Sequence, residues 1–361
     1  MNHKLFIALM AAALAGGTSL VNADATLYGQ LDLSIDAEDQ DGVRDDVNMG
    51  SNRSSIGVKG SEALGNGMSA FFKLEWQVDI DDADIEKSSF NEDETSGGFT
   101  GRDQYMGLAF ERFGKLTFGT MSTAYKSDAA ALDPAYRTRI QSRNVGLQSV
   151  LHKGKGDAGQ GRATNTVRYD SPSWNGVSGT AHYTLDNDKD VDGDDDPFGA
   201  GVRYKGGNIY AFADYITNSR SGDSDAWQVG AKYTLNAFSF WGMYEFDQGL
   251  ISTQTWGTDN NGDGADVWNL GGSWTIGNNM LAFRYGQSDD GGAKIGGSKV
   301  RTEYNTWSIT GQHSFSNRTK VYAGFSEQDC DNGNQDNTAD VKFCEHRGED
   351  DIFTLGMRHN F

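Results

Sequence analysis

The sequence of 361 residues has few prolines, few cysteines and no long apolar run. Its 3 Pro argue against proline-rich disorder, and its 2 Cys leave room for a single disulfide. Beyond the N-terminal segment, no run of apolar residues exceeds five, at residues 209–213. A membrane-spanning helix needs roughly 18 such residues. If this chain crosses a membrane, it therefore does so with strands.

Basic residues are also scarce. The chain holds 31 Lys and Arg against 51 Asp and Glu, a formal net charge of -20. A surface that binds nucleic acid needs clustered Lys and Arg, so nucleic acid is not an expected partner. Glycine is abundant at 47 residues, and 11% of the chain is aromatic. This composition is typical of many strands joined by flexible turns, and it argues against a helical bundle.

The first 23 residues have the pattern of a secretory signal. Lys4 precedes an apolar stretch at residues 5–15, and Val21-Asn22-Ala23 fits a small-x-small cleavage site. A buried N-terminal helix is the alternative, but an acidic, strand-like pattern begins abruptly at Asp24. We therefore predict a signal peptide over 1–23 and export of the remainder.

Export permits the two cysteines to pair. Cys330 and Cys344 enclose a polar stretch, so a disulfide between them would close one loop. Such a bond stabilises by about 3 kcal/mol in the chain-entropy model. The alternative is a two-cysteine metal site, for which His346 is near but further ligands of suitable spacing are lacking. A disulfide is the favoured prediction.

Alternation of apolar and polar residues runs through the chain. In residues 69–79, Phe72, Leu74 and Trp76 fall on one face, and Lys73 and Glu75 on the other. A period of two indicates strands. About sixteen such segments of roughly 8 to 12 residues are predicted. They start near residues 25, 52, 69, 102, 115, 163, 178, 198, 208, 226, 238, 265, 280, 302, 319 and 350.

The connections between these segments alternate between short turns and long acidic loops. Residues 36–46, 79–94 and 186–196 hold 6, 8 and 7 acidic residues, which cannot enter a core unpaired. A soluble sandwich or propeller also alternates, but its apolar faces point into a dry interior. An exported chain with short turns on one side and long loops on the other fits a transmembrane barrel better. We predict an all-β, sixteen-stranded antiparallel barrel over 24–361.

The size of the barrel determines what lies inside it. Hydrocarbon offers the backbone no hydrogen-bond partner, so the sheet must close with no free edge. At about sixteen strands, side chains no longer fill the interior and an aqueous lumen remains. Charged residues on the inward faces are therefore expected to line water.

The last predicted strand ends on an aromatic residue. Phe353, Leu355, Met357, His359 and Phe361 alternate with more polar positions. Phe361 has a simple interpretation as a member of an interfacial aromatic girdle. A terminal Phe after an alternating strand also resembles the assembly signal of Gram-negative outer-membrane barrels. That resemblance implies the barrel assembly machinery as a partner.

Longer stretches carry a more specific resemblance. The chain is similar to the general trimeric porins of the Gram-negative outer membrane in TLYGQLDLSID (26–36), SSIGVKGSEALGNGMSAFFKLE (54–75), GRDQYMGLAFERFGKLTFGTMSTAY (101–125) and NTVRYDSPSWNGVSGTAHY (165–183). The resemblance implies a homotrimer in the lipid and lipopolysaccharide of the outer membrane. It also implies a long third loop, here residues 122–162, that folds inward and narrows the pore.

This loop differs in charge from the rest of the chain. It carries seven basic residues and three acidic ones, a net charge of +4. In the porin family, acidic residues of the loop face basic residues of the wall across the constriction. Matching motif to motif implies Asp133 and Asp128 for the acidic side, and Arg102 and Arg162 for the basic side. The predicted constriction residues are Arg53, Arg102, Asp128, Asp133, Arg137, Arg139, Arg162 and Arg168.

Some of these positions depart from the family pattern. The wall position before IGVKG, often Arg in the family, is Ser55, and Arg53 is the residue expected to replace it. Arg102 shares its register with apolar residues, so it points inward only if a bulge or a buried subunit interface intervenes. Arg168 shares a face with threonines and is predicted to line the lumen. The alternative for each arginine is an ordinary solvated place on the lumen wall.

No motif indicates an enzyme or a firm metal site. Asp188, Asp190 and Asp192 begin like a calcium loop, but the twelfth position is Gly199. Loose association of Ca²⁺ or Mg²⁺ with this acidic loop is expected instead, and no other cofactor. The histidines are scattered, and no nucleophile and base are paired in a recognisable motif.

Three functions follow as hypotheses. The leading one is a water-filled channel for passive diffusion of ions and small hydrophilic solutes, weakly charge-selective, with cations drawn by the acidic loops. The second is a substrate-specific anion porin in which the arginines of the long loop, such as Arg137 and Arg139, bind a carboxylate or phosphate. The third and least supported is an outer-membrane barrel hydrolase. Anchoring of divalent-bridged lipopolysaccharide is expected to accompany the channel.

Overall fold

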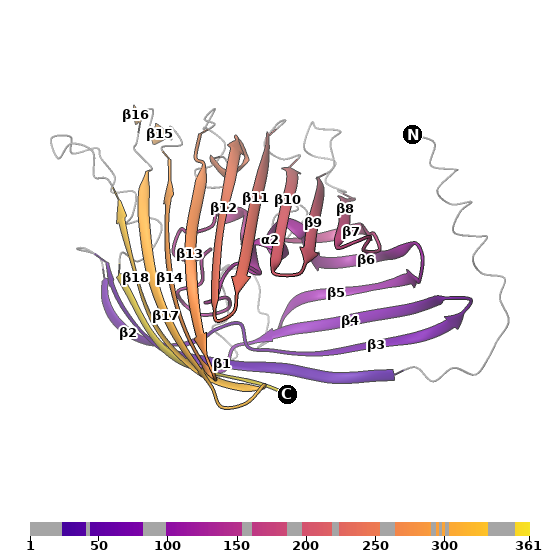
Figure 1. Cartoon of the computed structure of the whole chain (residues 1–361), viewed down its shortest axis with the longest axis horizontal. Coiled ribbons are helices and arrows are strands. Elements are labelled where there is room, and N and C mark those ends of the chain that lie inside the picture. The colour runs from indigo at the N-terminus through magenta and orange to yellow at the C-terminus, as the bar shows by residue number, and fades with distance from the viewer. Residues whose placement is uncertain are drawn as a thin grey trace.

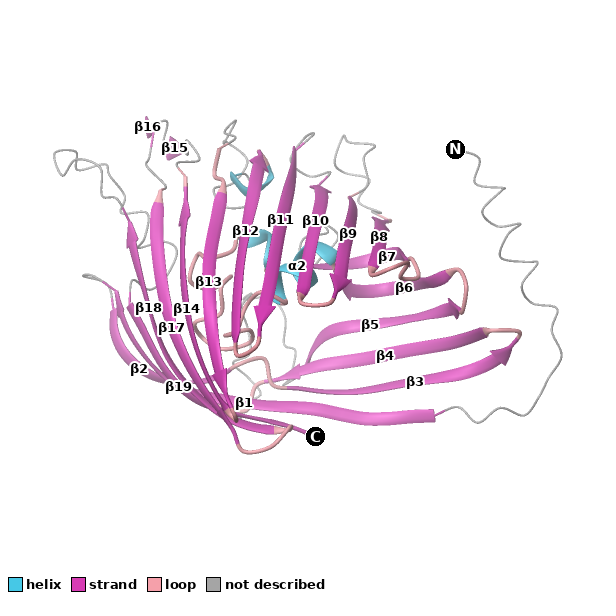
Figure 2. Ribbon diagram, viewed as in Figure 1, coloured by secondary structure: helices cyan, strands magenta, loops and turns pink. Residues whose placement is uncertain are grey.

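The computed structural model forms one closed β-barrel (Figures 1 and 2). It describes residues 24–40, 44–81, 99–153, 161–185, 197–218, 224–252, 264–289, 294–295, 298–299, 303–330 and 351–361. The strands are β1 (Asp24–Gln40), β2 (Arg44–Ser51), β3 (Ser55–Gly65), β4 (Met68–Val78), β5 (Phe99–Phe110), β6 (Gly114–Ser122), β7 (Arg162–Asp170), β8 (Val177–Thr184), β9 (Phe198–Gly206), β10 (Ile209–Asn218), β11 (Ser224–Leu235), β12 (Phe238–Gln248), β13 (Val267–Ile276), β14 (Asn279–Ser288), β17 (Tyr304–Ser314), β18 (Thr319–Cys330) and β19 (Asp351–Asn360).

The main sheet has 17 strands in the described part of the chain, but two of them share one place in the wall. β3 pairs with the first part of β1, and β2 pairs with the second part. They are therefore one wall strand broken at residues 52–54, and the barrel has sixteen strands. A separate hairpin, β15 (Lys294–Ile295) with β16 (Ser298–Lys299), completes the described strands. The prediction of a sixteen-stranded antiparallel barrel is confirmed.

Each of the sixteen predicted starts lies within three residues of the first residue of a strand. One connection was predicted wrongly. Residues 36–46 are not an acidic loop, because β1 continues to Gln40 and β2 begins at Arg44. The carboxylates enter the wall because they are paired there: Asp36 accepts hydrogen bonds from Thr354 (2.6 Å) and Ser34 (2.8 Å), and Glu38 forms an ion pair with Arg139.

The two faces of the wall differ as a membrane barrel requires. Phe240 on β12 is 56% exposed on the outer face, whereas the neighbouring inward residues Trp241 and Glu245 are buried. On β19, Leu355 points outward and Arg358 inward. Apolar side chains thus cover the outside, and polar ones line the inside. No helix in the described residues is long and apolar enough to cross a membrane.

The barrel closes where its first and last strands meet. β1 pairs with β19, and the backbone of Gly29 exchanges hydrogen bonds of 3.1 and 3.0 Å with Phe361. The Phe361 ring covers Gly29 so closely that a Cβ added there would lie 2.2 Å from the ring. Only glycine leaves room for the ring at this seam.

Replacing Gly29 with alanine should therefore weaken closure. We expect G29A to lose about 1–3 kcal/mol, the usual cost of overpacking. The measurement is denaturant unfolding of the refolded protein in detergent. G311A is the matched control, because a Cβ at Gly311 of β17 meets nothing closer than 3.9 Å. Equal stability of the two variants would contradict a sterically tight seam.

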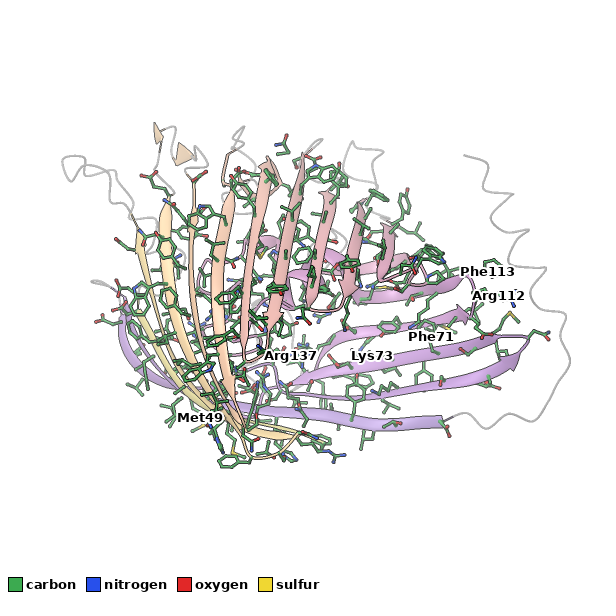
Figure 3. All side chains as sticks on the ribbon, viewed as in Figure 1. Met49, Phe71, Lys73, Arg112, Phe113 and Arg137 are labelled. Atoms are coloured by element: carbon green, nitrogen blue, oxygen red, sulfur yellow. The ribbon has the colours of Figure 1, made fainter. Side chains whose placement is uncertain are left out.

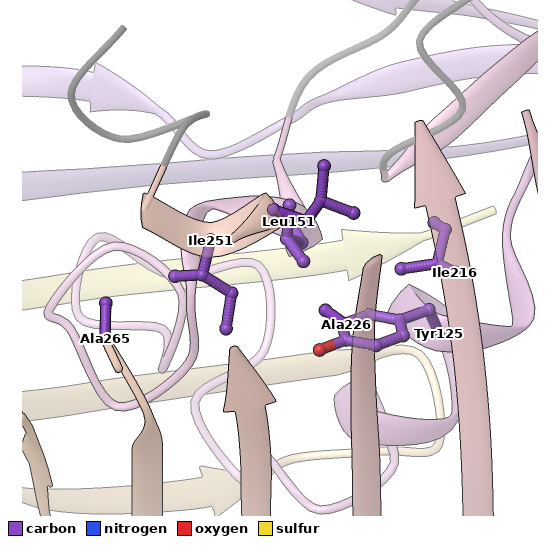
Figure 4. Packing of buried hydrophobic residues seen from close by; sticks show 7 residues of the cluster. Tyr125, Leu151, Ile216, Ala226, Ile251 and Ala265 are labelled. Atoms are coloured by element: carbon purple, nitrogen blue, oxygen red, sulfur yellow. The ribbon is translucent and has the colours of Figure 1, made fainter. Parts of the chain in front are cut away.

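The connection between β6 and β7 folds into the barrel, as predicted. It begins with α2 (Ala124–Ala130), whose N-cap is Thr123, and contains the 3-10 turn η1 (Val150–His152). In Figures 1 and 2, α2 lies inside the ring of strands. Small apolar clusters pack this loop against the wall. One of them comprises Tyr125, Leu151, Ile216, Ala226, Leu250, Ile251 and Ala265 (Figure 4).

Candidate functional site

The long loop, residues 123–161, is fastened to the wall by a buried ion pair. Arg284 of β14, which is fully buried, donates to Asp133 (2.7 Å), to the Ser142 hydroxyl (3.0 Å) and to the Ile140 carbonyl (2.8 Å). Asp133 also accepts from the backbone N–H groups of Ala135 and Ser142. The carboxylate of Asp133 is therefore turned towards the wall and away from the lumen.

Asp128 on α2 is held in the same way. It accepts a hydrogen bond of 2.9 Å from Tyr210 and forms an ion pair of 3.1 Å with Arg203. Burial raises the pKa of Asp128, and Arg203 opposes that shift. Both acidic residues predicted for the constriction thus pair with basic residues of the wall strands behind the loop.

A third attachment holds the other end of the loop. Glu245 of β12 accepts hydrogen bonds from the Tyr125 hydroxyl (3.0 Å) and from the Ser149 N–H (2.9 Å) and hydroxyl (2.5 Å). His152 of η1 lies 3.0 Å from the same carboxylate. Charged groups on β9, β12 and β14 therefore hold the loop against this part of the wall.

The opposite wall carries basic residues in ion pairs. Arg102 pairs with Glu75 at 2.6 Å, and Arg162 pairs with Asp103 at 2.8 Å. Arg102 reaches the lumen because the β4–β5 register shifts between Leu74 and Trp76. Such a bulge was expected from the sequence, because Arg102 otherwise shares its register with outward-facing apolar residues. No subunit interface is needed to turn this side chain inward.

Arg168 and Arg139 lie at the edges of this region. Arg168 pairs with Asp170 at 2.7 Å and donates to the Ser122 carbonyl, beside the start of the loop. Arg139 pairs with Glu38 of β1. Both arginines are therefore partly neutralised by wall carboxylates.

Two arginines of the region have unusual backbones. Arg53, in the break between β2 and β3, has φ 60°, and Arg137 in the loop has φ 68°. The four other described non-glycine residues with positive φ are all Asn, a residue that tolerates this conformation better than Arg does. Strain of this kind persists where the surroundings impose it, often at functional sites. Arg137 donates from the loop to Gln30 of β1, and Arg53 lies on the wall near Arg143 of the loop.

Four cations in this region lack a carboxylate partner. Among the residues that the structure describes, no ion pair is formed by Arg53, Lys126, Arg137 or Arg143. Arg137 instead donates to the Gln30 amide oxygen (3.1 Å), and Arg143 to the His152 carbonyl (3.2 Å). The excess of positive charge is therefore local to the loop and the facing wall.

Neighbouring titratable groups of the loop respond to this charge. Burial lowers the pKa of Lys126 well below its ordinary value, and Arg162, Arg143, Arg53 and Arg102 lower it further. Burial alone would raise the pKa of the Tyr136 phenol. Arg143 and other nearby arginines nevertheless hold that pKa below its usual range. The arginines contribute to both shifts in the direction that a positive potential requires, and at Tyr136 they outweigh burial.

The structure gathers some predicted residues and separates others. Arg53, Arg102, Arg137 and Arg162 lie in one basic region, whereas Asp128 and Asp133 lie behind the loop. Sequence reasoning did not select Lys126, Arg143, Glu75 and Asp103. Of these four residues, only Glu75 was indicated by the sequence, because the alternation of β4 places it on the polar, inward face.

The predicted divalent-ion association and the predicted disulfide concern other parts of the chain. Asp188, Asp190, Asp192 and Cys344 lie outside the described residues, as does the side chain of Cys330. The described part of the chain contains no group of three or more His, Cys, Asp or Glu side chains placed to hold a metal ion.

Solved structures with this fold include several porins. The anion-selective porin from Comamonas acidovorans gives a TM-score of 0.70 at 18% identity, covering 94% of this chain and 100% of that one. Salmonella typhi OmpF gives 0.68 at 16%, covering 93% and 97%. The trimer form of Vibrio cholerae OmpT gives 0.61 at 16%, covering 94% and 99%.

Sequence comparisons give the family. Major outer membrane protein P.IB of Neisseria meningitidis is 29% identical over 57% of this chain and 56% of that protein. An outer membrane porin protein of Bordetella pertussis is 27% identical over 66% of each chain. The match with P.IB thus spans little more than half of that relative's length. The family model described as Gram-negative porin matches residues 8–333, and the chain therefore belongs to the Gram-negative porin family.

Proposed function

We propose that this protein forms a water-filled channel in the outer membrane for passive diffusion of ions and small hydrophilic solutes, and that its constriction prefers anions. The observation that carries the proposal is the set of basic side chains that form no ion pair among the described residues, Arg53, Arg137 and Arg143, with Lys126 beside them. Family membership supports a channel rather than an enzyme.

The preference follows from where the charges lie. Asp128 and Asp133 are paired with Arg203 and Arg284, so they offer little attraction to a passing cation. Arg53 and Arg137 are partly exposed between loop and wall. A narrow passage with walls of low dielectric focuses their potential and raises the local anion concentration. The resemblance implied acidic residues on the loop facing basic residues on the wall. We propose instead that basic residues lie on both the loop and the wall at the constriction.

The test is a reversal potential in planar bilayers. With a tenfold KCl gradient at low salt, chloride should permeate several times faster than potassium. The preference should shrink as salt rises, because the screening length falls from about 10 Å at 0.1 M to 3 Å at 1 M. Absence of conductance would contradict the channel, and a cation preference would contradict the constriction.

The remaining predictions complete the proposal. The mature chain is one barrel domain, residues 24–361, released from a signal peptide over 1–23, with Cys330 and Cys344 paired. It assembles as a homotrimer, which the trimer form of the structurally similar OmpT supports. The barrel assembly machinery recognises the last strand with Phe361. Acidic outer loops, including Asp188, Asp190 and Asp192, associate with lipopolysaccharide through Ca²⁺ or Mg²⁺.

A further inference from the structure

Three aromatic rings on β1, β4 and β5 face the aqueous interior. Phe71 of β4 shares its face with Lys73 (Figure 3) and with Glu75, which pairs with Lys73 and with Arg102 of the lumen wall. Tyr28 of β1 donates a hydrogen bond of 2.9 Å to Glu75, and Tyr105 of β5 is paired in register with Lys73. Polar residues are the rule on the inner face of a wide barrel. A phenylalanine here therefore requires its own explanation.

Glycines allow two of these rings to lie against the wall. Phe71 is opposite Gly107, where a Cβ would lie 2.6 Å from the ring, and Tyr28 is opposite Gly57, where it would lie 2.7 Å away. The Tyr105 ring stands edge-on to Phe71, with centroids 6.3 Å apart and planes at 76°. Because one face of the Phe71 ring covers Gly107, the other is turned to the lumen.

Basic groups border these rings. Lys59 Nζ lies 5.1 Å from the centroid of the Tyr28 ring, and Lys73 Nζ lies 6.0 Å from it. Lys59 is opposite Lys73 in the β3–β4 register, which places it diagonally across from Phe71. Diagonal neighbours lie within reach of long side chains, about 7–8 Å apart. A carboxylate attached to a ring over Phe71 would therefore meet Lys59.

A cavity lies at the end of β4 next to Phe71. Its volume is about 710 Å³, and its lining includes Ser69, Ala109 and Arg168. Ser69 and Ala109 are two positions along their strands from Phe71 and Gly107, on the same face. Ligand sites typically measure roughly 300–1,000 Å³. This cavity is large enough for a small ring, and it begins one inward-facing position along β4 from Phe71.

We propose that Phe71, with Tyr28 and Tyr105, is a binding site in the channel for small aromatic carboxylates. The ligand ring stacks on Phe71, and the carboxylate is held by Lys59. The inference rests on the proposed channel, since the basic constriction favours anions and the rings then select among them. A neutral sugar could also stack on a ring, but it would gain nothing from the lysine.

The experiment is block of single-channel current by benzoate. Cyclohexanecarboxylate is the matched probe, because it has the same charge and similar size but no aromatic face. Benzoate should bind about two- to tenfold more tightly than cyclohexanecarboxylate, the usual advantage of an aromatic pair. Phe71→Ala should remove the difference, and Phe240→Ala, on the lipid-facing surface of β12, should retain it.

The outcomes separate the two proposals. Equal block of the wild-type channel by both probes, or tighter binding of glucose than of benzoate, would overturn the aromatic site. That comparison needs no substitution, so it holds even if Phe71→Ala fails to fold. A chloride preference in the salt gradient with no benzoate effect would contradict only this site, whereas a silent bilayer would contradict the channel itself.

Discussion

Exchanging both strained arginines for glutamate should reverse the charge selectivity of the channel. Arg53 on the wall and Arg137 on the loop form no ion pair among the described residues. R53E/R137E changes the local charge by four units. We expect the ratio of chloride to potassium permeability to fall at least about tenfold, because 1.4 kcal/mol suffices for that factor and one charge at 4 Å supplies about 1–4 kcal/mol. The measurement is the reversal potential in a KCl gradient.

Two controls isolate the effect of charge. R53K/R137K keeps both charges and should retain the chloride preference. Arg112→Glu changes charge in the short turn after β5, which Figure 3 shows far from Arg137, and it should alter the reversal potential only slightly. If R53E/R137E still prefers chloride as strongly as wild type, the basic region does not set the selectivity.

Removing Arg284 should release the middle of the long loop. Its guanidinium group holds Asp133, the Ser142 hydroxyl and the Ile140 carbonyl within 3.0 Å. Arg284→Met leaves the Asp133 charge buried without its ion-pair partner, which costs roughly 3–5 kcal/mol. The barrel strands keep their pairing, so we expect the loop to detach from the wall before the barrel unfolds. We expect a larger single-channel conductance with frequent fluctuations, and tryptic cleavage at Arg137 or Arg139 in the folded protein.

A double variant tests the electrostatic cause. Replacing a buried ion pair with apolar residues is often close to neutral, so Arg284→Met with Asp133→Leu should recover much of the resistance to trypsin. Lys320→Met is a suitable control, because Lys320 also projects from the wall but its ammonium donates only to Gln312 of the neighbouring strand. Wild-type conductance and trypsin resistance in Arg284→Met alone would show that the ion pair does not hold the loop.

The site was less predictable than the fold. The net charge of the loop predicted a basic region at the constriction. The resemblance to the porin family indicated Arg102 and Arg162 as residues of its wall. Asp133 was assigned to the pore side, but its orientation depends on Arg284, which lies 151 positions away in the sequence. The inward position of Arg102 depends on a bulge between β4 and β5.

The sequence alone determined the number of strands, their approximate starts and which face of each is apolar. The alternation of apolar and polar residues along a strand is visible in neighbouring residues alone. The membrane then requires the sheet to close into a barrel, because hydrocarbon offers no hydrogen-bond partner to a free edge. The tertiary structure decided that β1 and β2 extend through the acidic segment, because Asp36 and Glu38 meet Thr354 and Arg139 there. It also decided which charges of the loop face water. Those outcomes depend on pairing between distant strands, which local alternation does not encode.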